Sequence, residues 1–143
     1  MQFKLWMGLS VLALAGCDQL GQKAMDAIPN PSPQQEQVAQ AAYDNLRDGE
    51  FEQFLNHLEP ELKSHFQDNQ KVMKRFAKVI PKDEYKSRTL MTKSIETGSN
   101  QPGQYKISYE YAYPKNLVQY DVSFDQPGGS SKIRNLNIQV FGE

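Results

Sequence analysis

A single cysteine, two histidines and a row of tyrosines are the residues of this chain whose types could carry chemistry. Cys17 is the only thiol, so the chain can form no disulfide within itself. It follows an apolar run from Leu5 to Leu14, which begins directly after Lys4. Ten residues make a helix of roughly 15 Å, about half the thickness of the hydrocarbon core of a bilayer. The run therefore predicts an export signal rather than a membrane span.

The residues around the cysteine resemble the lipobox of bacterial lipoproteins. Leu14-Ala15-Gly16-Cys17 has the order of that motif, aliphatic, small, small and cysteine, immediately after the apolar run. The resemblance implies that residues 1–16 are a signal peptide that is removed, and that Cys17 receives a diacylglycerol and an amide-linked acyl chain. Two or more acyl chains hold a protein stably on a membrane surface. The alternative is a free or buried thiol that happens to follow a signal region.

The same resemblance predicts where the protein works. A lipoprotein of this kind is anchored on the extracytoplasmic, periplasmic face of the cell membrane. Asp18 directly follows Cys17 and resembles the sorting signal that keeps lipoproteins of enteric bacteria in the inner membrane. We therefore expect the inner membrane rather than the outer one.

Residues 17–34 are predicted to be a linker between the lipid anchor and the domain. Pro29, Pro31 and Pro33 stand at alternate positions, which favours an extended chain. The alternative is a short helix over residues 19–27 that packs on the domain. Residues 35–143 are enough for one domain with a single core.

Apolar residues at spacings of three and four predict three short amphipathic helices between residues 35 and 81. Gly49 suits the end of the first helix. Pro60 breaks or restarts the second, and Leu62 and Phe66 are expected to continue its apolar face in a short turn. Asp68 or Asn69 suits the start of the third. The three stripes are Val38, Ala42 and Leu46; Phe51, Phe54, Leu55 and Leu58; and Val72, Met73, Phe76, Val79 and Ile80.

Alternating patterns predict four strands in the second half of the chain, at residues 85–97, 105–113 and 118–124 and from Ile133 onward. Ile133 is out of phase with Leu136, so we expect a β-bulge near Asn135. Helices followed by hairpin-connected strands indicate an α+β protein. The predicted fold is three N-terminal helices packed on a curved four-stranded antiparallel sheet.

This order of elements resembles the NTF2-like, or cystatin-like, α+β roll. The segment from Leu46 to Leu55 looks like the turn between the first two helices in many small members, and the segment from Lys132 to Ile138 resembles their final strand. The superfamily includes isomerases and dehydratases, in which an Asp or His base faces a Tyr or Asp acid between sheet and helices. The resemblance therefore implies an enzyme of that type as an alternative function.

No residue is predicted to be catalytic from the sequence itself. His57 and His65 lie in polar surroundings that are typical of surface histidines, and Asp121 lies on the polar phase of its strand, which predicts an exposed carboxylate. The chain lacks an HExxH motif, a serine elbow, a glycine-rich phosphate loop and a Cys/His metal spacing. We therefore expect no cofactor and no metal site.

One face of the second strand carries four tyrosines, which are Tyr105, Tyr109, Tyr111 and Tyr113. They either form a surface that contacts a ligand or partner, or they fill the core. A net charge of −1 and an exported location argue against nucleic acid.

The expected function is that of a membrane-anchored module that binds a protein partner, a small apolar ligand, or a second copy of itself through the sheet face. The alternatives are the enzyme named above and a purely structural envelope protein.

Overall fold

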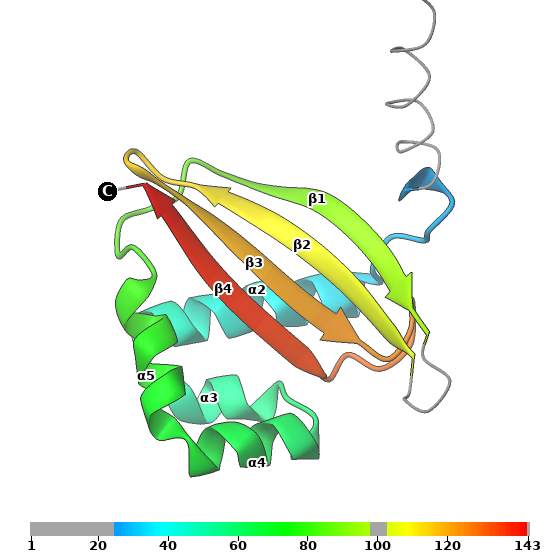
Figure 1. Cartoon of the computed structure of the whole chain (residues 1–143), viewed down its shortest axis with the longest axis horizontal. Coiled ribbons are helices and arrows are strands. Elements are labelled where there is room, and N and C mark those ends of the chain that lie inside the picture. Colours follow the sequence, from blue (N-terminus) through cyan, green and yellow to red (C-terminus); the bar gives the residue numbers. More distant parts are fainter. Residues whose placement is uncertain (1–24, 98–102, 143) are drawn as a thin grey trace, which may run out of the picture.

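The computed structural model describes residues 25–97 and 103–142 (Figure 1). The predictions on Cys17, on Asp18 and on the signal region therefore lie outside the described residues. Within them, four helices precede a four-stranded antiparallel sheet, so the α+β class is confirmed. The helices are α2 (Pro33–Asp48), α3 (Phe51–Asn56), α4 (Pro60–Asp68) and α5 (Gln70–Val79). The strands are β1 (Ser87–Glu96), β2 (Gln104–Ala112), β3 (Asn116–Phe124) and β4 (Asn135–Gly142).

Helix α2 begins two residues earlier than the sequence predicted. The Ser32 side chain accepts a hydrogen bond from the Gln35 backbone N–H, and the Gln35 side chain accepts one from the Ser32 N–H, each at 3.1 Å. This capping box satisfies two backbone donors that would otherwise lack partners. Pro33 occupies the first turn, where its missing N–H costs nothing. The helix ends as predicted at Gly49, whose φ of 75° is the left-handed conformation that glycine adopts readily.

The described residues form four helices where three were predicted, because the chain after Pro60 forms a helix of nine residues rather than a short turn. Proline fits the first turn of a helix, so Pro60 ends one helical segment and starts the next. Asn69 precedes α5 as expected, but its side chain donates to the carbonyl oxygen of His65 at 2.8 Å. It therefore caps the end of α4 and not the start of α5.

The sheet is a simple meander in the order β1-β2-β3-β4 (Figure 1). The predicted bulge near Asn135 is wrong, since β3 and β4 pair without a register shift. Ile133 instead lies before β4, where it is fully buried and forms an isolated parallel bridge with Leu58. The one register shift in the described sheet lies in β1, between Leu90 and Thr92.

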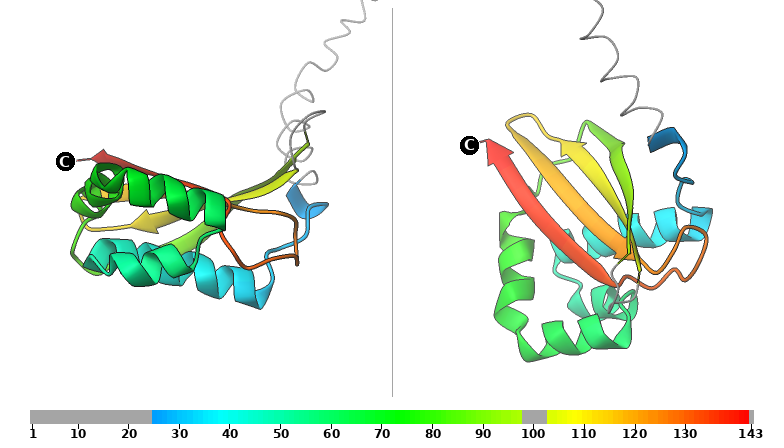
Figure 2. Two further views of the ribbon diagram at one scale, coloured as in Figure 1. Left: turned by 90° about the horizontal axis from the view of Figure 1, so that it is seen from below. Right: turned by 45° about the vertical axis from the view of Figure 1, so that its right-hand side comes forward.

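The helices cover only one face of the sheet. Helix α2 crosses behind the strands, and α4 and α5 lie beyond the edge formed by β4 (Figures 1 and 2). The buried core lies between α2 and the facing side chains of β2 and β3. In the described part of the chain, the opposite face of the sheet, here called the outer face, has no helix over it.

The segment before α2 is held on the domain. Lys93 Nζ donates to the Ile28 carbonyl and to the Asn30 side chain, both at 2.8 Å, and the Tyr105 hydroxyl donates to the Pro29 carbonyl at 2.6 Å. The folded body therefore extends back to about residue 28, into the segment that the sequence assigned to the linker. No helix among the described residues has the length and apolar character that crossing a membrane requires.

Candidate functional site

The four tyrosines of the predicted row all lie in the core. Their exposed fractions are 0% for Tyr105, 1% for Tyr109, 0% for Tyr111 and 6% for Tyr113. They point from the inner face of the sheet toward α2. Of the two interpretations offered by the sequence, core packing is the one that the structure shows.

A line of polar residues on α2 runs beside these tyrosines. Glu36, Gln40 and Asp44 are four residues apart, so they share one side of the helix. Glu36 accepts a hydrogen bond from the Tyr109 hydroxyl at 2.9 Å. Its other carboxylate oxygen lies 3.2 Å from Nη1 of Arg88, which reaches in from β1. The polar line therefore meets the tyrosine row and the half-buried Arg88 cation at one place.

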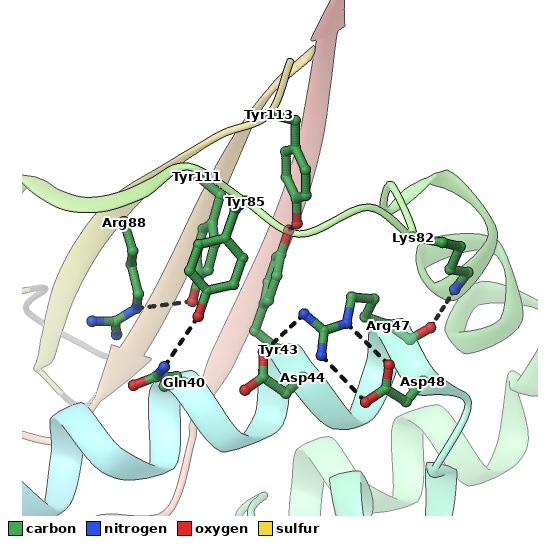
Figure 3. A network of polar contacts seen from close by, with 10 residues as sticks. All are labelled: Gln40, Tyr43, Asp44, Arg47, Asp48, Lys82, Tyr85, Arg88, Tyr111 and Tyr113. Carbon is green, nitrogen blue, oxygen red and sulfur yellow. Dashed lines mark hydrogen bonds and ion pairs between the residues drawn. The ribbon is translucent and has the colours of Figure 1, made fainter. Parts of the chain in front are cut away.

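Arg88 ties two tyrosines of β2 into this cluster. Its guanidinium lies 4.0 Å from the centre of the Tyr109 ring, which is a cation–π contact. Its Nε donates to the Tyr111 hydroxyl at 2.9 Å (Figure 3). The side chain thus uses its charge, its planar face and its donors to join β1, β2 and α2.

Tyr43 of α2 completes the contact between helix and sheet. Its ring stacks on that of Tyr111 with centroids 3.9 Å apart, and its hydroxyl shares a 2.6 Å hydrogen bond with that of Tyr113 (Figure 3). Burial raises the pKa of Tyr43, of Tyr111 and of Tyr109, and it raises the pKa of Tyr105 to about 12. The hydroxyls therefore stay protonated at neutral pH and can donate hydrogen bonds.

Three buried polar atoms in the described part of the chain have no hydrogen-bond partner: Asp44 Oδ1, Arg88 Nη2 and the Tyr120 hydroxyl. All three belong to residues that line the same interface. Burial raises the pKa of Asp44, although the neighbouring Arg47, with Nη1 at 3.5 Å from Oδ1, acts in the opposite direction. A carboxyl with a raised pKa near tyrosine hydroxyls has the group types of an acid–base site. In this conformation, however, the stacked rings occupy the space between α2 and the sheet.

Sequence reasoning did not single out Glu36, Asp44 or Arg88. The signal for the first two was a polar line at helical spacing beside the apolar stripe of α2. The signal for Arg88 was its position on the inward phase of β1, opposite Tyr111. Neither signal says that the two segments meet, because 52 residues separate Glu36 from Arg88.

The polar residues that the sequence did consider lie elsewhere. His57 is half-buried, and burial, followed by the charge of Lys132, lowers its pKa. His65 is exposed on α4. Asp121 is half-buried rather than exposed, because it accepts hydrogen bonds on the outer face from Ser108 Oγ at 2.5 Å and from Gln119 Nε2 at 3.2 Å.

The outer face of the sheet carries two hollows, with volumes of about 240 and 220 Å³. The first is polar, and its lining includes Glu96, Lys106, Asp121, Asn135 and Asn137. The second is lined in part by Met91, Leu117 and Phe141, whose exposed fractions are 45%, 43% and 52%. The outer face is therefore polar at one end and apolar at the other.

Comparison with protein-family models, with curated proteins and with solved structures found no match to this chain. Over residues 25–97 and 103–142, no group of His, Cys, Asp and Glu is placed to hold a metal ion. The proposals below therefore depend on the sequence motifs and on the geometry.

Tyr43→Phe and Tyr120→Phe should differ in their effect on stability. Tyr43→Phe leaves the buried Tyr113 hydroxyl unpaired and should lower the free energy of unfolding by about 1–3 kcal/mol. Tyr120→Phe removes a buried hydroxyl that has no protein partner, so it should leave stability unchanged or raise it by up to about 1 kcal/mol. Urea unfolding at equal m-value measures both. A clear loss for Tyr120→Phe would contradict the unpartnered state of that hydroxyl.

The raised pKa of Asp44 predicts a pH-dependent contribution to stability. An acid with a folded pKa above its unfolded value binds protons on folding, so its favourable contribution is present at low pH and is lost as the pH rises through the folded pKa. Between pH 7 and pH 4, the wild-type chain should therefore gain stability relative to Asp44→Asn as the pH falls. Thermal unfolding of both chains across this range measures the difference, and a pH-independent difference would contradict the assignment.

Proposed function

We propose that this protein is a lipid-anchored module of the bacterial cell envelope that binds a protein partner through the outer face of its sheet. The observation that carries the proposal is the cross-strand pair of Leu117 and Phe141, which lie directly opposite each other on β3 and β4 and remain exposed. Met91 lines the same hollow. Exposed apolar side chains that gather in one place, next to polar groups, are typical of protein interaction sites.

The anchor is supported by the motif Leu14-Ala15-Gly16-Cys17 and by the apolar run from Leu5 to Leu14 that leads into it. We propose that acylated Cys17 holds the mature protein on the extracytoplasmic face of the membrane, and that Asp18 favours the inner membrane. We also propose that the fold is an NTF2-like, or cystatin-like, roll. The support is the succession of helices and a four-stranded meander, with α2 packed on the inner face.

A small-molecule enzyme is a second candidate, favoured by one observation. The Asp44 carboxyl, with its raised pKa, lies at the same interface as the tyrosine cluster. Base and acid of these types would suit an isomerase or a dehydratase. Substrate access would require α2 to move away from the sheet, because Tyr43 and Tyr111 are stacked there. The binding module needs no such movement.

The anchor predicts the covalent state of the native protein. Mass spectrometry of protein extracted from bacterial membranes should find an N-terminus at Cys17 that carries acyl mass. Cys17→Ser should remain unprocessed or leave the detergent-extracted membrane fraction, because no sulfur is present to receive the diacylglycerol. Unchanged processing and partition of Cys17→Ser would reject lipidation at this residue.

The partner surface can be tested by crosslinking in living cells. A photo-reactive phenylalanine analogue at Gln139, which is exposed on the edge strand β4 opposite Gln119 of the apolar hollow, should give a discrete adduct of higher mass. The matched control is the same analogue at Gln67, which is exposed on α4. An adduct at twice the mass of the chain would identify a second copy as the partner. Equal adducts from both positions, or none from Gln139, would contradict an interface on the outer face.

A further inference from the structure

Helix α5 carries its positive charge on a single side. Lys71, Lys74, Arg75 and Lys78 follow the spacing i, i+3, i+4, i+7, which places all four on one face of the helix. All four are exposed, and from residue 70 to residue 82 the chain has no acidic residue. These four residues are here called the cationic stripe.

The opposite side of α5 packs on the core. Met73 and Ala77 are buried, and Val72 and Phe76 are partly buried against the core cluster. The ion pairs found in the described residues involve arginines of other elements, and none involves the stripe. The whole chain has a net charge of only −1, so the stripe is a local segregation of charge rather than a general excess.

Further cations lie beside the stripe. An open hollow of about 570 Å³ is lined by Lys74, Lys78 and Lys82, and also by Arg47 and Asp48, which form an ion pair with each other. Lys82 Nζ donates to the carbonyl oxygen of Arg47 and, at 3.0 Å, to that of Ala77, so it neutralises the negative ends of α2 and α5. The positive potential around the stripe is therefore not cancelled by the helix ends next to it.

We propose that the cationic stripe docks the domain on the anionic phosphate headgroups of the bilayer to which the protein is anchored. This inference rests on the proposed lipid anchor. A Lys or Arg near an anionic membrane surface strengthens binding about fivefold, and four on one face act together. Because the apolar side of α5 is packed on the core, the stripe would act on the membrane through its charge alone.

The chain between anchor and domain is long enough for this arrangement. The described chain enters at the N-terminal end of α2, whereas α5 adjoins its C-terminal end (Figure 1). The sixteen residues of α2 separate the two by about 24 Å. The eight peptide units from Cys17 to Met25 can span up to about 29 Å. Since the acyl chains already supply stable attachment, the stripe would set the orientation of the domain on the membrane.

Vesicle binding without the anchor tests the proposal. The mature-length chain, residues 17–143 with Cys17→Ser, is sedimented with vesicles of zwitterionic lipid alone or with about one third phosphatidylglycerol. The stripe variant carries Lys71→Gln, Lys74→Gln, Arg75→Gln and Lys78→Gln. The control removes the same charge elsewhere through Lys63→Gln, Lys86→Gln, Lys106→Gln and Lys115→Gln. Circular dichroism and thermal unfolding establish that each variant is folded.

We expect the chain with the unaltered stripe to bind only the vesicles that contain phosphatidylglycerol. It should lose most of this binding when the salt concentration is raised from about 0.05 to 0.5 M. The stripe variant should bind at least tenfold more weakly, whereas the control should stay within about threefold of the parent. Equal losses in both variants, binding to zwitterionic vesicles, or no vesicle binding at all would overturn the proposal. Because the tested chain carries no lipid, its result is independent of the mass measurement on Cys17.

Discussion

The structure depends on the attachment of α2 to the tyrosine-lined face of the sheet. Stacking of Tyr43 on Tyr111 supplies apolar contact area there, while the bridge from Glu36 to Arg88 and the hydroxyl pair of Tyr43 and Tyr113 satisfy polar groups that burial would otherwise penalise. A sheet of this kind needs one covered face to be stable and can leave the other in water. Because α2 covers the inner face, the outer face remains free to meet another molecule.

The interface between α2 and the sheet also holds polar atoms that make no hydrogen bond within the described chain. Asp44 and Tyr120 each place a buried oxygen there without a hydrogen-bond partner in the described chain. Such atoms cost free energy, which for Asp44 is offset in part by Arg47 Nη1 at 3.5 Å from the same oxygen. They are the reason why an acid–base role stays a second candidate, although the rings now fill the space that a substrate would need.

In the arrangement that we propose, the lipid anchor, the cationic stripe and the outer face would each have a separate role. The described chain enters at one end of α2, and α5, which carries the cationic stripe, lies near the other end (Figure 1). The outer face of the sheet is separate from both. Attachment by a lipid at one end and by the stripe at the other would restrict the rotation of the domain on the membrane more than a tether alone. A partner in the envelope would then meet the outer face at a restricted set of angles.

The sequence by itself determined what local sterics and periodicity control. The helix end at Gly49 follows from the left-handed conformation that glycine allows, and the alternation of Tyr105 to Tyr113 defines β2 and places its tyrosines on one face. Only the tertiary structure decided that Ile133 pairs with Leu58, and that Arg88 meets Glu36 across 52 residues. The physical reason is that these contacts are set by the packing of distant segments, and neither partner carries a local preference for the other.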